Sequence, residues 1–122
     1  MNIQSRVVNW LWECFGGEAA RDPVERVHRF AEEALELGQA CGMTMGEWQE
    51  LLEYVYGRAP GEIGQEVGGV MVTLAGLCGA QGVSMEGEAD REICRIESDE
   101  VMEKIRAKQA SKPAVGPLPG CS

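Results

Sequence analysis

The 122-residue chain contains little from which a sheet, a zinc site or a disulfide framework could be built. No stretch alternates apolar and polar residues in the manner of a half-buried strand. The five cysteines are widely spaced, include no CxxC pair and are accompanied by a single histidine, which argues against zinc and against paired disulfides. Aspartate is scarce, and glutamate, the main acid, loses little rotamer freedom in a helix. We therefore expect an all-α fold.

Several catalytic signatures are also missing from the sequence. There is no Gly-rich P-loop, no nucleophile elbow and no Ser/His/Asp set. The one ExxH motif, Glu25 to His28, has no second copy, and a di-iron bundle needs two. Any chemistry must therefore come from carboxylates and basic side chains.

The net charge of −9 makes the chain a poor general binder of nucleic acid or of an anionic membrane. The charge is uneven, because no acid follows Glu103 while Lys104, Arg106, Lys108 and Lys112 do. We expect no nucleic-acid partner and no membrane partner, and we expect a basic segment near the C-terminus.

Residues 67–85 carry no formal charge, as a membrane span would. Five glycines, together with Thr73, Gln81 and Ser84, and an amphipathic spacing favour a helix of a soluble protein. Glu13 interrupts the short apolar N-terminal stretch, so no secretory signal peptide is expected. A cytoplasmic location follows as the prediction.

Helical periodicity is clearest in three segments, each bounded by residues typical of helix ends. They are residues 23–42, which open on Asp22-Pro23, residues 44–57, which open on a Thr44/Glu47 capping box, and residues 61–82. A further helix is expected over residues 84–108, with a break near Ser98-Asp99, and another over residues 7–15. We predict one domain over residues 1–112, a helical bundle of four to five helices completed by dimerisation, and a flexible Pro/Gly-rich tail over residues 113–122.

Two acidic stripes accompany the apolar faces of these helices. Glu33 and Glu36 lie one turn apart, where their carboxylates repel each other unless a cation lies between them. In the third segment Glu62 and Glu66 share a stripe. Clustered carboxylate oxygens suit Mg²⁺ or Mn²⁺ rather than zinc. A solvated acidic face remains the alternative interpretation.

The layout resembles the MazG-like, all-α NTP pyrophosphohydrolases, over roughly residues 24–112. Their pattern is an EExxEL helix followed about thirty residues later by an EExxD-type helix. Residues 32–37, EEALEL, match the first motif, and residues 65–70, QEVGGV, look like the second. A basic segment after the second motif, residues 104–108, is also similar.

The resemblance implies hydrolysis of a nucleoside triphosphate to a monophosphate and pyrophosphate, in nucleotide-pool house-cleaning. It implies that Glu33, Glu36 and Glu66 are catalytic metal ligands for Mg²⁺, with Mn²⁺ as a substitute. It also implies a homodimer or a dimer of dimers. Three basic side chains are candidates to hold the substrate phosphates: Lys104, Arg106 and Lys108.

Two departures from the family pattern bear on activity. Gly69 stands where the family has Asp, and Gln65 replaces the first Glu of the second motif. Glu62, one turn before Glu66, could take the place of the Asp as a metal ligand. The alternative is a non-catalytic helical protein of the same fold that binds a nucleotide or a protein partner.

Overall fold

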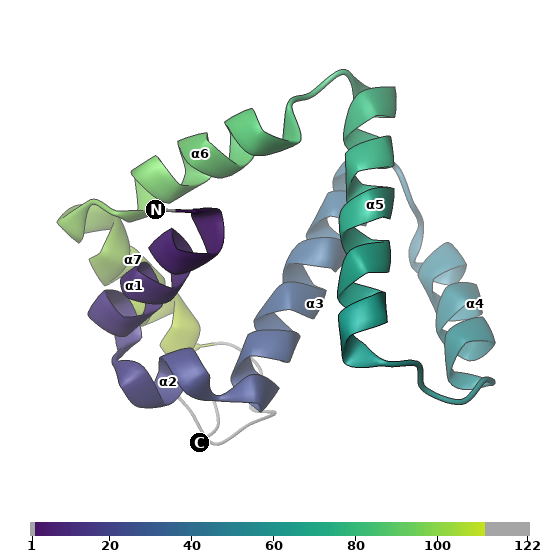
Figure 1. Cartoon of the computed structure of the whole chain (residues 1–122), viewed down its shortest axis with the longest axis horizontal. Helices are drawn as coiled ribbons and strands as arrows, with labels where there is room; N and C mark the ends of the chain where they lie inside the picture. Colours follow the sequence, from purple (N-terminus) through teal and green to yellow (C-terminus); the bar gives the residue numbers. More distant parts are fainter. Residues whose placement is uncertain (1, 112–122) are drawn as a thin grey trace. The chain divides into compact units, whose positions relative to one another are not determined.

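The computed structural model describes residues 2–111, which form helices and no strands (Figure 1). This confirms the all-α fold class. In chain order the helices of this range are α1 (Ile3–Phe15), α2 (Gly17–Arg21), α3 (Pro23–Ala40), α4 (Met45–Tyr56), α5 (Ile63–Gln81), α6 (Met85–Ile96) and α7 (Asp99–Ala110).

The helix ends follow the local chemistry that the sequence predicts. Thr44 accepts a hydrogen bond from the Glu47 N–H, and the Glu47 carboxylate returns one to the Thr44 N–H, a capping box that starts α4. Gly82 ends α5 in the left-handed conformation, with φ of 71°, which glycine adopts without steric cost. Ser98 caps α7 and separates it from α6, which confirms the predicted break.

The predicted number of four to five helices is too low for the described residues. The short helix α2 gives no periodic signal, because it has only 5 residues. It begins after Gly16, whose φ of 88° turns the chain out of α1. The break at Ser98 adds a further helix.

The chain divides into two compact units, within the range that the sequence predicts as one domain. Unit 1 consists of Met1–Ala31 and Glu86–Ser122, and unit 2 of Glu32–Met85. Helix α3 runs from one into the other. The predicted tail, residues 113–122, lies outside the described residues.

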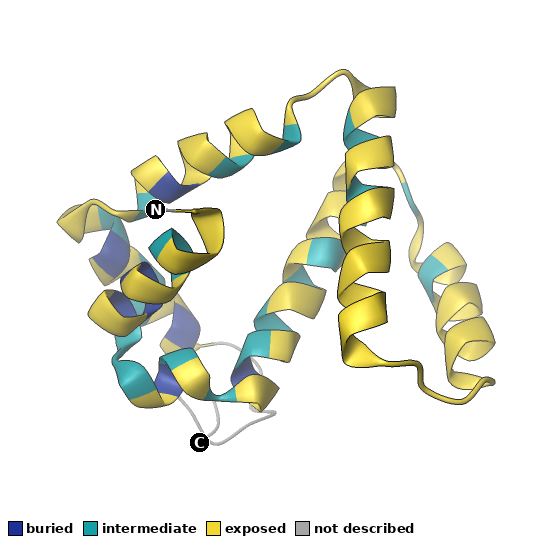
Figure 2. Ribbon diagram, in the orientation of Figure 1, coloured by how far each residue is buried: buried dark blue, intermediate teal, exposed yellow. Residues whose placement is uncertain are grey.

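Unit 1 has a hydrophobic core, formed mainly by α1 and α7 (Figure 2). Trp10, Leu11 and Cys14 of α1 are buried together with Met102 of α7. The Trp10 indole donates a hydrogen bond to the Ile96 carbonyl over 2.8 Å, so the polar atom of this buried ring is satisfied.

Unit 2 has no such core: none of residues 32–85 is buried (Figure 2). Most of the large apolar side chains that stay exposed in the described chain belong to this unit. They include Leu51, Leu52 and Val55 of α4, and Val67, Val70 and Met71 of α5. Cys41, which also belongs to this unit, is likewise exposed.

Unit 2 has one close contact between helices and one helix of unusually apolar composition. The Trp48 ring of α4 packs against Gly38 of α3, where a Cβ atom would overlap the ring. Helix α5 is apolar around most of its circumference, and by length and composition alone it is one helix that could cross a membrane.

Candidate functional site

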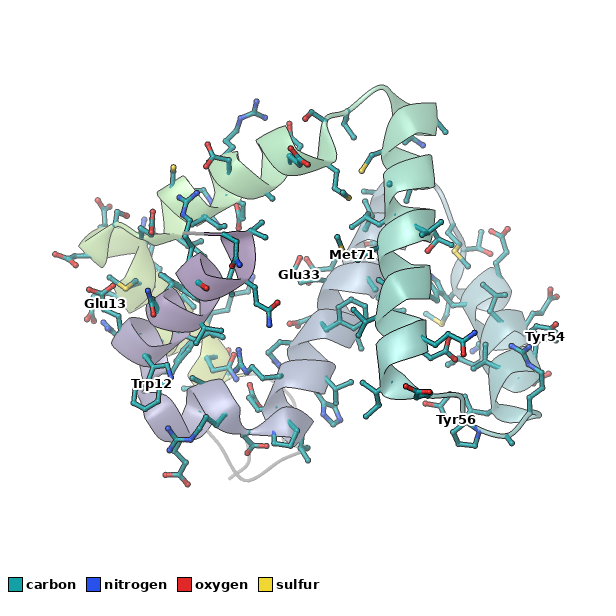
Figure 3. All side chains as sticks on the ribbon, in the orientation of Figure 1. Trp12, Glu13, Glu33, Tyr54, Tyr56 and Met71 are labelled. Carbon is teal, nitrogen blue, oxygen red and sulfur yellow. The ribbon has the colours of Figure 1, made fainter. Side chains whose placement is uncertain are left out.

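The first acidic stripe lies on the half of α3 that belongs to unit 2. Glu33, labelled in Figure 3, and Glu36 are both exposed and one helical turn apart. The stripe begins after Arg29, which lies one turn before Glu33. Both carboxylates are thus accessible to a cation from solvent.

The second acidic stripe is at the start of α5, also in unit 2. Glu62 is the N-cap residue of α5, but its side chain makes no capping hydrogen bond. The Glu66 carboxylate folds back onto Gly61, where a Cβ atom would lie only 2.6 Å from Glu66 Oε2. Gly61 thereby lets Glu66 lie over the first turn of α5, whose positive end favours a carboxylate.

The four predicted ligands therefore lie in one unit, on two helices. Among residues 2–111, however, no three Asp, Glu, His or Cys side chains converge closely enough to hold a metal ion. The chemistry of these oxygen donors suits Mg²⁺, but one described chain does not gather them. The assignment of Glu33, Glu36, Glu62 and Glu66 as ligands stays a prediction.

Gly69, where the family has Asp, lies in a regular part of α5. Its carbonyl accepts a hydrogen bond from Thr73 Oγ1 over 2.9 Å, as is usual for threonine in a helix. A Cβ atom at Gly69 would meet nothing within 4 Å. The backbone at this position would therefore accept an Asp without a steric conflict.

The three basic candidates lie on α7, in unit 1. Arg106 Nε donates to the Cys14 carbonyl over 2.7 Å, and its NH1 donates to Glu103 Oε1 over 2.7 Å. This guanidinium is thus engaged at the C-terminal end of α1, although 39% of the Arg106 side chain remains exposed. Lys104 and Lys108 are exposed, and Lys104 Nζ lies 3.5 Å from Glu100 Oε1.

Sequence reasoning missed a buried polar cluster in unit 1. Glu25 of α3, only 2% exposed, accepts a hydrogen bond from Gln109 Nε2 of α7. Arg29 Nε and Arg26 NH2 lie 3.3 and 3.7 Å from the same Glu25 oxygen. The available signal was the arginine four residues after the glutamate, because side chains at positions i and i+4 are neighbours on a helix.

An exposed aromatic side chain also lies in unit 1. Trp12 of α1, labelled in Figure 3, stays 49% exposed, and its ring borders a shallow hollow lined by Val8, Asn9 and Glu13. The Arg21 guanidinium carbon lies 4.8 Å from the centre of the Trp12 ring, a cation–π contact. The ring is thereby held against α2.

Comparison with known proteins adds no relative: no family model, curated protein or solved structure matches the chain. The resemblance to the MazG-like pyrophosphohydrolases therefore depends on the two acidic motifs, their order and their helices.

Proposed function

We propose that the protein is a cytoplasmic, Mg²⁺-dependent nucleoside triphosphate pyrophosphohydrolase that removes surplus or non-standard nucleotides. It acts as a homodimer or a dimer of dimers. Its substrate is a small nucleotide, and it binds neither nucleic acid nor a membrane. Mn²⁺ can substitute for Mg²⁺, because both prefer carboxylate oxygens and water.

One observation carries the proposal. The two carboxylate pairs belong to the unit that lacks a core. Glu33 and Glu36 lie on α3, and Glu62 and Glu66 lie at the start of α5. Covering these helices with a second copy would remove apolar surface from water, at about 25 cal/mol per Å². The same covering would desolvate the carboxylates, whose repulsion then requires a cation.

A protein cover suits unit 2 better than lipid does. Its exposed apolar side chains are not confined to α5, since α4 exposes Leu51, Leu52 and Val55 among Glu47, Glu50 and Glu53. Such a mixed face packs in a bundle with charges at its rim, whereas lipid would leave the acids without water.

The chain's own residues have separate roles in this proposal. Glu33, Glu36 and Glu66 hold the metal, and Glu62 takes the place of the missing Asp. Mg²⁺, when bound, neutralises the triphosphate and supplies an activated water. Lys108 is exposed and can contact phosphates, whereas Lys104 must first leave Glu100 and Arg106 must first leave the Cys14 carbonyl.

A second candidate function is favoured by Gly69. With no carboxylate at this position and no ligand cluster within residues 2–111, the same helices could serve a non-catalytic protein that binds a nucleotide or a protein partner. This candidate predicts self-association without metal-dependent hydrolysis.

Pyrophosphate release from a panel of canonical and modified NTPs and dNTPs, with Mg²⁺ or Mn²⁺, separates the two candidates. The enzyme proposal expects release by the wild type, none with Glu36→Gln or Glu66→Gln, and full release with the control Glu50→Gln on α4. Wild-type protein that releases no pyrophosphate from any member of the panel contradicts it and favours the binding protein.

A further inference from the structure

One face of α4, in unit 2, combines exposed apolar side chains with acids. Four residues follow the i, i+3, i+4, i+7 spacing of a single helix face: Glu47, Glu50, Leu51 and Tyr54. Leu51 is 46% and Tyr54 63% exposed. Trp48, which packs against Gly38 of α3, lies on another side of the helix, so we call these four residues the outer face of α4. Figure 3 shows Tyr54 on the side of α4 that points away from α5.

The acids of the outer face lack the neighbouring bases that accompany acids elsewhere in the chain. On α6, Glu88 and Glu92 each pair with an arginine three residues later. On α4, the residues three and four positions after Glu50 are Glu53, which borders the outer face, and Tyr54. Like charges at this spacing repel each other and destabilise the helix. A cation from outside the chain would relieve that repulsion.

The aromatic ring of the outer face already contacts a guanidinium. The Arg58 guanidinium carbon lies 4.4 Å from the centre of the Tyr54 ring, a cation–π contact. Arg58 is the only base among residues 32–85, which hold eight acids. Because Tyr54 stays 63% exposed, part of its surface remains open to a further cation. The outer face therefore has both the charge and the aromatic surface to bind a basic side chain from another molecule.

We propose that the outer face of α4 binds a basic, arginine-containing segment of a partner protein. An arginine of the partner contacts the Tyr54 ring, further bases pair with Glu50 and Glu53, and an apolar side chain covers Leu51. Charge complementarity selects a basic partner, because a second copy would bring the same acids to the contact. Tyrosine is enriched at protein interfaces, which fits an exposed ring on this face. The proposal goes beyond the proposed function and needs no metal.

Other occupants fit the outer face less well. A second copy meets no charged side chain on residues 67–81 of α5, so that helix is better suited to self-association. Nucleic acid is repelled by the acids. A small polyamine would pair with Glu50 and Glu53, but it would leave Leu51 and much of the Tyr54 ring in water. A protein segment supplies both the charges and the apolar cover.

The probe for the test is a fluorescent peptide of about 18 residues, roughly five helical turns. It is made of arginine, leucine and alanine, patterned as an amphipathic helix, and its binding is followed by anisotropy. The wild type should bind it. The double variant Glu50→Gln/Glu53→Gln should bind about fivefold more weakly, because an exposed ion pair strengthens binding by a factor of about 1.4 to 5.

A matched double variant controls for the loss of net charge. Glu88→Gln/Glu92→Gln removes the same number of charges from α6, where both acids are exposed and paired with arginines. It should bind the peptide as the wild type does. Equal losses in the two double variants would mean that the peptide responds only to the overall charge of the protein, and would overturn the proposal.

Variants of Tyr54 test the aromatic contact. Tyr54→Ala should weaken binding about threefold, the effect of losing an exposed cation–π contact. Tyr54→Phe keeps the ring and should retain the wild-type affinity, and circular dichroism should show unchanged helix content in both. Wild-type affinity in Tyr54→Ala would remove the ring from the site.

Three further results would also overturn the proposal. The first is no binding of the peptide by the wild type. The second is equal binding of a peptide with the same residues in scrambled order, or displacement of the peptide by an equal concentration of spermidine, since either result leaves only charge attraction. The third is loss of binding as the protein is concentrated, which would assign the outer face to a second copy.

The experiment fails or succeeds independently of metal-dependent hydrolysis. Glu36→Gln, which should abolish pyrophosphate release, should bind the peptide as the wild type does. Glu50→Gln should weaken peptide binding and leave pyrophosphate release intact. A protein that binds the peptide but hydrolyses no nucleotide would reject the enzyme proposal and leave the outer face of α4 standing.

Discussion

Units 1 and 2 are both built from helices that carry large apolar side chains, yet among the described residues only unit 1 contains buried ones. In unit 1, Trp10, Leu11 and Met102 pack together, and Arg6 pairs with Asp90 over 2.8 Å. In unit 2 the comparable side chains, such as Leu52 and Val70, stay exposed. Unit 1 has a hydrophobic core, whereas unit 2 leaves its large apolar side chains exposed.

The largest loss of stability is expected from a cavity in the unit 1 core. Leu11→Ala is expected to lower the free energy of unfolding by about 2–5 kcal/mol, because it leaves a cavity beside Cys14 and Met102. The loss should not depend on protein concentration, as measured by urea denaturation. The matched change Leu52→Ala in unit 2 should lower stability mainly where it weakens association, so its effect should shrink as the protein is concentrated. Equal, concentration-independent losses would remove the distinction between the units.

Metal binding should act on unit 2. At a hundredfold excess over its dissociation constant, Mg²⁺ is expected to stabilise the wild type by about 2.7 kcal/mol, seen as a higher melting temperature. Glu36→Gln and Glu66→Gln should abolish the rise, Glu62→Gln tests the substitute ligand, and Glu50→Gln should leave the rise unchanged.

A carboxylate introduced at position 69 is a second test of metal binding by unit 2. Gly69→Asp should strengthen metal binding, since a Cβ atom at Gly69 meets open space. A wild-type melting curve that Mg²⁺ does not move would count against the metal site altogether.

A third prediction concerns the contact between α3 and α4. Gly38→Ala places a methyl group in the Trp48 ring and should destabilise unit 2 by about 1–3 kcal/mol, the usual cost of overpacking. Gly46→Ala, whose Cβ would meet only Thr44 Oγ1 at 3.9 Å, should instead stabilise α4 slightly, since alanine favours a helix. Thermal melts followed by circular dichroism would measure both changes. An unchanged melting temperature for Gly38→Ala would show that the Trp48 ring does not hold the two helices together.

The smallest effect is a pH dependence at the start of α4. The hydrogen bonds from Thr44 hold the pKa of Glu47 below its ordinary value of 4.5. A carboxylate with a lowered pKa adds stability at pH above 4.5, and that stability is lost as the pH falls through its folded-state pKa. Thr44→Ala should therefore melt lower than the wild type near neutral pH, with the gap narrowing below pH 4.5 as the hydrogen bond from the Thr44 hydroxyl to the Glu47 carboxylate loses its charge. A difference in melting temperature that stays constant across that pH range would mean that protonation of Glu47 does not weaken the capping box.

The sequence predicts local structure well and long-range structure poorly. Caps at Thr44, Gly82 and Ser98 need only neighbouring residues, so their helices begin and end as expected. The cluster of Glu25 with Gln109 joins residues 84 positions apart, and no pattern within one helix predicts it. The sequence predicts that Glu33 and Glu36 share one helix face and that Glu62 and Glu66 share another. Whether the two pairs converge depends on how α3 and α5 pack.

Self-association of unit 2 predicts that a charge on α5 has a different effect from the same charge on unit 1. Val70 and Val8 are 40% and 42% exposed, so they form a matched pair. Val70→Asp should separate the copies and abolish Mg²⁺ stabilisation, whereas Val8→Asp should do neither. Circular dichroism would establish that both variants keep their helices.

The central claim, that a second copy covers unit 2, is tested most directly by sedimentation of the wild-type protein. At tens of micromolar, roughly the range in which obligate assemblies stay associated, the account predicts a dimer or tetramer. Val8→Asp should sediment with the wild type, and Val70→Asp should sediment as a monomer. A wild-type protein that sediments as a helical monomer at that concentration would contradict the account.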